Sequence, residues 1–176
     1  MKNILIVSGH TDLNNSIANK KILEELSKRL PNAKIDYLCE LYPDYIIDVD
    51  KEQEKLLKAD IIVLQYPVFW YSMPSLLEKW MEETFKHGFS HGSTGDKLKG
   101  KKMIVSLTTG AKEEVYSNID DFLNPIKASC KLCQMEYVGG IVTYGVSYQI
   151  RNDKGKEIEK KAVNHADRLI EMLNNL

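Results

Sequence analysis

Three segments of the chain carry residue types that can hold a ligand, and each one follows an apolar run. In "SGHTDLNNSIAN", Ser16 and Asn19 open a predicted helix whose free amides favour a phosphate, and His10 can add positive charge. In "QYPVFWYSMPSLLEKW", the bulky residues 68–71 can wall a flat ring. In "LTTGAKEEVY", Gly110 lets backbone amides approach a ligand closely.

Apolar runs and helical periodicity predict the elements that position these segments. Strands are predicted over residues 2–8, 33–41, 60–67, 101–110 and 136–146. Helices are predicted over residues 16–30, 49–59, 74–88, 120–135 and 156–176. This alternation predicts one α/β domain over residues 1–176 with a doubly wound sheet, in which ligands bind beyond the carboxyl ends of the strands. The three segments are therefore expected to meet.

Composition excludes several classes of function. The chain has 43% hydrophobic and 28% charged residues and a formal charge of -1, which argues against nucleic acid as a partner. No apolar stretch approaches membrane-spanning length, and no cleavage-type segment follows the first apolar run. A cytoplasmic location is therefore expected.

The cysteines and histidines offer two further candidates for chemistry. Cys39, Cys130 and Cys133 are typical of a reducing compartment, and "CKLC" is either a redox motif or, as its mid-helix spacing favours, a structural pair. His87 and His91 have helical spacing, but the glycine after each of them argues against a helix there. No metal site is expected.

Taken singly, the first segment is also typical of helix capping and the third of a turn. Taken together, a phosphate cradle, an aromatic wall and an exposed amide edge suit a flat ligand with polar edges and a phosphate tail, which is the shape of flavin mononucleotide (FMN). The polar loop over residues 89–100 is expected to form the rim over the ring.

Several ordered motifs resemble the flavodoxin-like NAD(P)H:quinone oxidoreductase family. They are "PVFWYSMPSLLEKWMEETF", the His10 loop with "NSIANK", "HGFSHG" and "LKGKKMIVSLTTGA". The short bacterial ancillary proteins of glutathione-gated potassium efflux systems are most similar, and they share "LYPD" and "EQE". The resemblance implies a flavodoxin-like five-stranded parallel sheet of order 2-1-3-4-5 with helices on both faces.

The resemblance also implies roles for individual residues. The family's phosphate and ribityl loop corresponds to His10, Ser16, Ile17, Ala18 and Asn19. Its flavin-lining segment corresponds to Val68, Phe69, Trp70 and Tyr71. Its T-T-G-G motif corresponds to Thr108, Thr109, Gly110 and Ala111. Ala111 replaces a glycine and can crowd the backbone near the ring. Tyr116 stands at the spacing of a tyrosine that assists hydride transfer, whereas Phe122 replaces the family's histidine partner. Amides near Gly110 are expected to stabilise charge on the flavin.

The activity that the resemblance implies is that of a flavin-dependent NAD(P)H dehydrogenase (quinone). Hydride would pass from NAD(P)H to FMN, with FAD as the alternative cofactor, and two electrons would then reach a quinone-like acceptor. A homodimer is implied, and a potassium efflux transporter would hold the protein at the inner face of the cell membrane. Two alternatives stay open: a regulatory ancillary subunit of such a transporter, and a one-electron carrier of flavodoxin type. The acceptor and the choice between NADH and NADPH also stay open.

Overall fold

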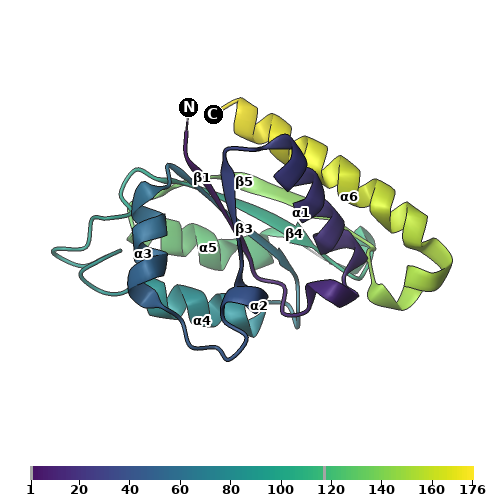
Figure 1. Ribbon diagram of the computed structural model, residues 1–176, viewed down its shortest axis with the longest axis horizontal. Helices are drawn as coiled ribbons and strands as arrows, with labels where there is room; N and C mark the ends of the chain where they lie inside the picture. The colour runs from purple at the N-terminus through teal and green to yellow at the C-terminus, as the bar shows by residue number, and fades with distance from the viewer. Residues whose placement is uncertain (1, 117) are drawn as a thin grey trace.

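The computed structural model describes residues 2–116 and 118–176, in which helices flank one parallel sheet (Figure 1). Its strands are β1 (Ile4–Ser8), β2 (Ala33–Tyr37), β3 (Ile61–Pro67), β4 (Lys102–Thr108) and β5 (Glu136–Thr143). They lie in the order β2-β1-β3-β4-β5, and every neighbouring pair is parallel. The predicted five-stranded sheet and its strand order are confirmed.

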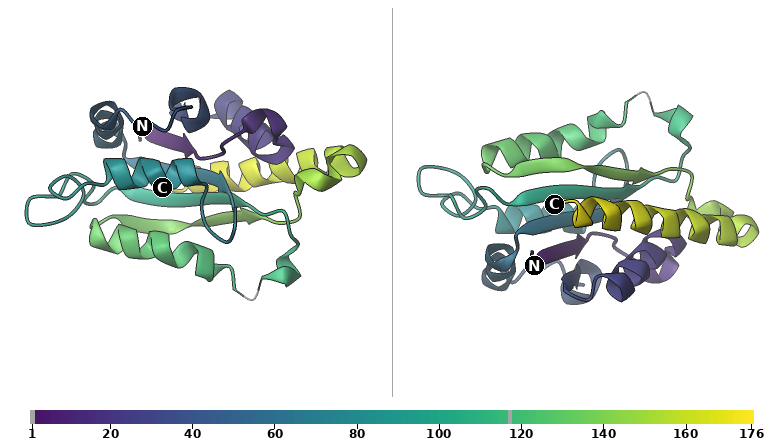
Figure 2. Two further views of the ribbon diagram at one scale, coloured as in Figure 1. Left: turned by 90° about the horizontal axis from the view of Figure 1, so that it is seen from below. Right: turned by 90° about the horizontal axis from the view of Figure 1, so that it is seen from above.

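Helices cover both faces of this sheet. They are α1 (Ile17–Arg29), α2 (Leu38–Leu41), α3 (Val49–Lys58), α4 (Ser75–Thr84), α5 (Asp120–Leu132) and α6 (Arg151–Asn174). Single-turn 3-10 helices span Leu13–Asn15, Glu113–Val115 and Tyr148–Ile150. In Figure 2, α4 lies in front of the sheet in the view from below and α6 lies in front of it in the view from above. The predicted layers are therefore confirmed.

Two clusters of buried side chains, one on each face, hold the helices to the sheet. Ile22 of α1 and Leu169 of α6 belong to one cluster, and Leu56 of α3 and Trp80 of α4 belong to the other. The central strand β3 is buried along its whole length and supplies side chains alternately to both clusters. A doubly buried apolar run in the sequence therefore became the centre of the sheet.

β2 is shorter than predicted, because residues 38–41 form α2 instead of continuing the strand. The pairing of β1 with β2 ends at Ser8 and Tyr37, so the chain beyond Tyr37 has no neighbouring strand to bond with. One helical turn instead buries Leu38 completely. The strand prediction for residues 38–41 is wrong because alternating hydrophobicity does not report where the neighbouring strand ends.

α4 ends at Thr84 rather than at Gly88. The Thr84 hydroxyl donates to the Trp80 carbonyl at 2.7 Å, and Gln53 on α3 donates to the Thr84 carbonyl at 2.9 Å. These bonds satisfy carbonyls of the last turn, so a tertiary contact ends the helix before the glycine. The C-terminal helix α6 begins at Arg151, before the predicted Lys156, and has a kink at Lys154.

The loop over residues 89–100 lies at the amino ends of the strands, and Figure 1 shows it projecting beyond α3. The Gly100 amide donates to the Gln134 carbonyl at 2.9 Å, directly before β5, and the Lys102 amide donates to the Asp60 carbonyl at 3.0 Å, directly before β3. The expectation that this loop forms a rim at the carboxyl ends of its own chain is wrong. A connection that follows a helix and precedes a parallel strand must return to the amino edge of the sheet.

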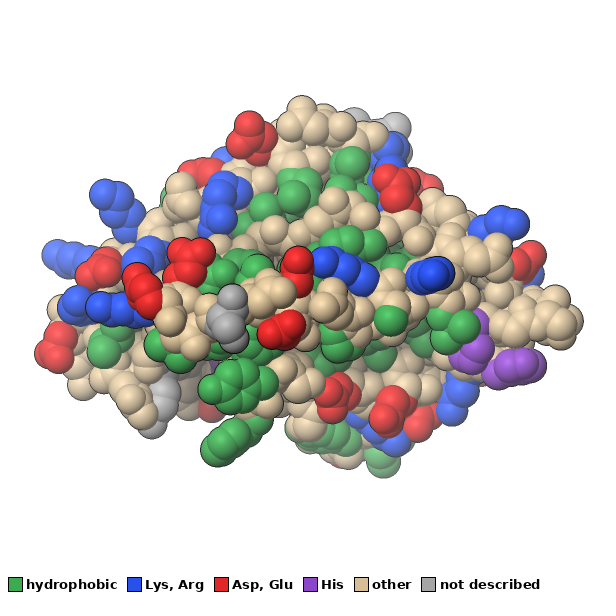
Figure 3. All heavy atoms as spheres, turned by 180° about the vertical axis from the view of Figure 1, so that it is seen from behind, with side chains coloured by type: hydrophobic (Ala, Val, Ile, Leu, Met, Phe, Trp, Pro, Cys, Tyr) green, Lys and Arg blue, Asp and Glu red, His purple; other side chains and the backbone are tan. Residues whose placement is uncertain are grey.

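The surface of the molecule mixes charges of both signs, and in Figure 3 hydrophobic side chains reach it across the middle of the face as well as at its lower left. The two ends of the chain lie close together in Figure 1, where the Lys2 ammonium donates to the Leu176 carbonyl. Among residues 2–116 and 118–176, no helix is both long and apolar enough to cross a membrane.

Candidate functional site

A cavity of about 590 Å³ opens at the carboxyl ends of β1, β3 and β4, where the three sequence segments meet. Nine residues predicted for the site line it: His10, Ser16, Ile17, Asn19, Val68, Phe69, Thr108, Thr109 and Gly110. Backbone hydrogen bonds join the segments, since the Val68 amide donates to the Thr108 carbonyl and the Gly9 amide to the Gln65 carbonyl, each at 2.8 Å. The expected convergence is therefore present in the structure.

The remaining predicted residues lie outside the lining. Ala18 is buried in α1, Trp70 is 95% exposed, Tyr71 is 70% exposed, and Ala111 and Tyr116 are half-buried nearby. The turn after β3 explains the two aromatics. Phe69 and Ser72 exchange backbone hydrogen bonds at 2.9 Å, while Trp70 and Tyr71 have φ angles of 50° and 64°. This tight turn keeps Phe69 at the cavity and directs Trp70 outward.

The start of α1 supplies the polar end of the cavity. Ser16 is the N-cap residue, and its hydroxyl accepts a hydrogen bond from the Asn19 amide at 3.2 Å. Free amides in the first turn of a helix and the helix dipole attract a negatively charged group. This end of the cavity therefore suits a phosphate.

His10 lines the same region as a neutral ring. Its side chain is 9% exposed, and burial lowers the pKa of the imidazole despite the nearby Asp12 carboxylate. The Asp12 amide donates to His10 Nδ1 at 3.0 Å, which leaves Nε2 as the nitrogen that carries the proton. The expectation that His10 adds positive charge is therefore wrong, because burial disfavours the charged form. His10 can still donate a hydrogen bond.

The loop after β4 presents backbone groups at the cavity edge. The Thr109 amide donates to the Thr143 carbonyl at 2.9 Å, and the Thr109 hydroxyl donates to the Ala111 carbonyl at 2.8 Å. A Cβ atom placed on Gly110 would lie 3.6 Å from the nearest atoms of Ser147, which is an ordinary van der Waals distance. The fold itself therefore has room for a Cβ atom at Gly110, whereas a ligand pressed against this backbone would require glycine.

An aromatic cluster, which we define as Tyr71, Tyr116, Phe122 and Tyr144, holds Tyr116. The Tyr116 ring meets Phe122 edge-on at 5.2 Å and Tyr144 at 6.0 Å, and Tyr71 stacks on Phe122 at 6.0 Å. Phe122, which stands where the resemblance places a histidine, therefore packs directly against the predicted catalytic tyrosine. A role for Tyr116 stays a prediction.

Sequence reasoning missed Val146, Ser147 and Ile158, which also line the cavity. Val146 and Ser147 follow β5, so the rule that ligands bind beyond carboxyl ends of strands could have found them. It also missed Gln65, a fully buried amide inside the apolar strand β3. The signal was a polar residue in the run "IIVLQYP".

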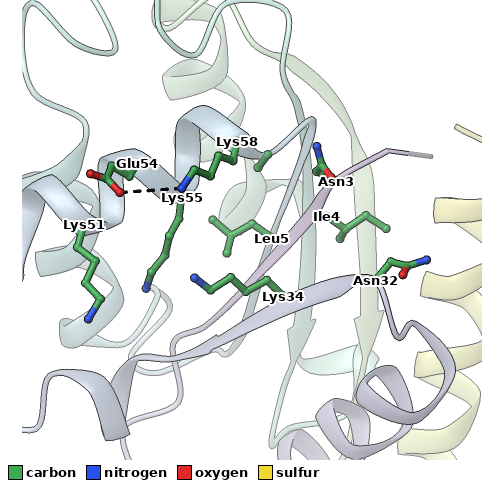
Figure 4. A pocket seen from close by; sticks show the side chains of 10 residues that line it. Asn3, Ile4, Leu5, Asn32, Lys34, Lys51, Glu54, Lys55 and Lys58 are labelled. Atoms are coloured by element: carbon green, nitrogen blue, oxygen red, sulfur yellow. Dashed lines mark ion pairs between the residues drawn. The ribbon is translucent and has the colours of Figure 1, made fainter.

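A second cavity of about 370 Å³ lies at the opposite end of the sheet, between β2 and α3 (Figure 4). Its lining includes Lys34 of β2 and, at helical spacing on α3, Lys51, Lys55 and Lys58. Carboxylates offset much of this charge. Lys55 binds Asp36 at 2.7 Å and also pairs with Glu52, and Lys58 lies 4.0 Å from Glu54. The geometry is that of a solvated charged groove.

The other chemical candidates from the sequence are not arranged for catalysis. Cys130 and Cys133 are buried, and burial raises the pKa of both thiols, that of Cys130 to about 11. A redox motif needs the opposite shift. The rings of His87 and His91 meet edge-on at 5.6 Å in a loop. Within residues 2–116 and 118–176, no three His, Cys, Asp or Glu side chains are grouped to hold a metal ion.

A family model described as "Flavodoxin-like fold" matches residues 2–169, which include every strand of the sheet. The chain belongs to this family. The resemblance drawn from the sequence motifs is confirmed, and relatives in the flavodoxin-like family include oxidoreductases and ancillary proteins of potassium efflux.

Three relatives cover most of the chain. General stress protein 14 of Bacillus subtilis (strain 168) is 38% identical over 157 residues, which are 85% of this chain and 89% of that protein. The uncharacterized NAD(P)H oxidoreductase YrkL of the same organism is 32% identical over 180 residues and 98% of each chain. The glutathione-regulated potassium-efflux system ancillary protein KefF of Enterobacter sp. (strain 638) is 37% identical over 140 residues, 77% of this chain and 79% of that protein.

A solved structure has the same architecture as this chain. General stress protein 14 of Treponema denticola, in complex with FMN, superposes with a TM-score of 0.84 at 24% sequence identity. The match covers 98% of this chain and 99% of that chain. At this identity the likeness shows that the two proteins share a fold.

Proposed function

We propose that the protein is a flavin-dependent NAD(P)H oxidoreductase that binds FMN beyond β1, β3 and β4 and passes two electrons to a quinone-like acceptor. The observation that carries the proposal is the cavity where a helix N-terminus, an aromatic side chain and a bare glycine backbone meet. The similarity of the whole chain to a relative named as an NAD(P)H oxidoreductase, which extends along 98% of this chain, supports the same activity.

The residues of the cavity fit FMN at three places. Ser16 and Asn19 offer polar groups for a phosphate, Phe69 offers an aromatic face, and the backbone at Gly110 is open to close approach. The volume of about 590 Å³ lies in the usual range for small-ligand sites, roughly 300–1,000 Å³. FAD stays the alternative cofactor.

FMN would supply the capacity to accept a hydride from NAD(P)H and to deliver electrons onward. The chain's own residues bind and orient. We propose that α1 holds the phosphate, that Phe69 packs against the ring, and that amides near Gly110 bond its polar edge. Tyr116, held in the aromatic cluster, is proposed to add a hydroxyl beside the reacting groups.

A second candidate function is that of an ancillary subunit of a potassium efflux transporter. It is favoured by the 37% identity to KefF over 77% of this chain. In that case the protein would work from the cytoplasm at the inner face of the membrane, and it would copurify with the transporter. A one-electron carrier of flavodoxin type is disfavoured if one quinone is reduced to the hydroquinone for each NAD(P)H consumed.

The test is FMN titration of purified protein, mass spectrometry of the bound cofactor, and NADH or NADPH oxidation with and without a quinone. The wild type should bind FMN and require it for turnover. Gly110→Ala should keep the melting temperature of the flavin-free protein, because the fold has room for the added Cβ atom, yet raise the FMN Kd at least about tenfold through overpacking against the ligand. If the wild-type protein binds no flavin, the proposed function is wrong.

A further inference from the structure

Gln65 is a buried amide that folding alone does not explain. It is fully buried in β3, where every other residue is buried as well, and it does not line the cavity. Among the described residues, its Oε1 atom has no hydrogen-bond partner. An unpaired buried acceptor destabilises the folded state, which an apolar residue of the same length would avoid. The Nε2 side of the amide is the part that is engaged.

Gln65 Nε2 donates to Asn19 Oδ1 on α1 at 2.7 Å. The Thr108 hydroxyl at the end of β4 donates to the same oxygen at 3.1 Å. Both bonds end on the same oxygen, so the oxygen end of the Asn19 side-chain amide faces the sheet. Asn19 Nδ2 is thereby turned toward Ser16, and it donates to Ser16 Oγ at 3.0 Å.

This arrangement sets the polarity of the Ser16 hydroxyl. Ser16 Oγ accepts a hydrogen bond from the side-chain Nδ2 of Asn19 at 3.0 Å and another from the backbone amide of Asn19 at 3.2 Å. A hydroxyl oxygen has two lone pairs and one hydrogen, so with both lone pairs engaged the hydrogen is left to donate elsewhere. Ser16 is half-buried at the cavity, so its O–H is available to an anionic group at the start of α1.

We propose that Gln65 is a positioning residue that keeps the Ser16 hydroxyl a donor toward the phosphate of FMN. The inference rests on the proposed function. If the side-chain amide of Asn19 were rotated by half a turn, its oxygen would face Ser16. The Ser16 hydroxyl would then donate its only hydrogen to Asn19. A lone pair would then meet the phosphate, which repels it. Gln65 thus acts on the ligand through Asn19 and Ser16 without touching it.

The experiment compares the binding of FMN and of riboflavin, which lacks the phosphate, to the wild type and to Gln65→Met. We expect Gln65→Met to raise the FMN Kd about tenfold, the scale of one hydrogen bond to a charged group, and to leave the riboflavin Kd within about twofold. Its melting temperature should not fall, because the unpaired Oε1 is removed. Gln65→Leu is a second variant with the same expectation should the first fail to fold.

A matched control and a double variant separate positioning from general damage. Thr84→Val removes another buried hydrogen bond, 2.7 Å from Thr84 to the Trp80 carbonyl, and should change neither Kd. In a Ser16→Ala background, Gln65→Met should have no further effect on FMN, since its target is gone. Equal losses for FMN and riboflavin, an unchanged FMN Kd, or additive losses in the double variant would overturn the inference while the proposed function stands. A wild type without FMN binding would overturn both.

Discussion

At the scale of single residues, the turn after β3 decides which aromatic side chain meets a ligand. Phe69 is 40% exposed and lines the cavity, whereas Trp70 is 95% exposed and does not. Non-glycine residues with positive φ are uncommon, and bulky ones even more so. The two in succession at Trp70 and Tyr71 are therefore a costly conformation, held by the hydrogen bonds between Phe69 and Ser72.

Phe69→Ala should weaken FMN binding by about 1–3 kcal/mol, the scale of lost aromatic contact and burial. The measurement is fluorescence titration with FMN. Leu41→Ala is the control, because Leu41 has nearly the same exposure, 41% against 40%, and lies on α2 outside the cavity. Equal Kd values for wild type and Phe69→Ala would remove Phe69 from the site.

At the scale of elements, the motifs "LYPD" and "EQE" join the short α2 to α3. Glu52 is fully buried, and its carboxylate accepts from Tyr42 at 2.6 Å and from Trp80 on α4 at 2.9 Å, while Lys55 pairs with it. Removing one partner of such a buried group leaves an uncompensated charge. Tyr42 and Glu52 from these two motifs therefore hold α3 to α4 on one face of the sheet.

α6 is fastened to the sheet by a buried histidine. His165 is fully buried, with Nε2 at 2.7 Å from the Ser106 hydroxyl of β4 and Nδ1 at 2.8 Å from the Thr143 hydroxyl of β5. Burial and the charge of Arg168 lower the pKa of His165 to about 3. The imidazole is thus neutral in the folded state down to about pH 3.

This histidine should make the protein less stable in acid. Between pH 6.5, the ordinary histidine pKa, and about 3, the unfolded chain takes up a proton that the folded chain does not, so the free energy of unfolding falls as pH falls. From pH 7 to pH 5 the loss from His165 is about 2 kcal/mol. Urea unfolding at both pH values measures it. His165→Gln, which retains hydrogen bonding, should not show this loss of stability. The control His87→Gln, at an exposed histidine, should still show it. An equal loss in His165→Gln would contradict the assignment.

At the scale of the whole molecule, large apolar side chains reach the surface beside the cavity. Trp70 is 95% exposed and Tyr71 is 70% exposed, next to the half-buried rings of the aromatic cluster. Exposed apolar patches of this kind mark interaction sites. A second copy of the chain is the partner that family resemblance implies.

We expect a homodimer at micromolar concentration that buries Trp70 near the FMN site, measured by sedimentation velocity. Trp70→Ala should raise the dimer Kd by about thirtyfold, which corresponds to the loss of roughly 2 kcal/mol at an interface anchor. Leu132→Ala is the control, because Leu132 is 61% exposed but ends α5. That end lies at the amino edge of the sheet, where the Gly100 amide donates to the Gln134 carbonyl. A wild type that sediments as a monomer at micromolar concentration would refute the dimer.

The sequence by itself determined the five strands and the five long helices to within a few residues at most ends, the strand order through its resemblance, and the region of the site. Apolar runs such as residues 60–67 predict buried strands because both faces of a central parallel strand must be covered. Parallel strands end at a common edge, so the segments after them had to meet there. Nine of the predicted residues line the cavity for this reason.

Only the tertiary structure decided the features that depend on contacts between distant segments. It ended β2 where β1 ends, placed the loop over residues 89–100 at the far edge, and turned Trp70 away from the cavity. It also made His10 neutral by burial and joined Gln65 to Asn19 across two elements. Side-chain direction, protonation and hydrogen-bond polarity are set by neighbours that are remote in sequence, and local pattern carries no record of them.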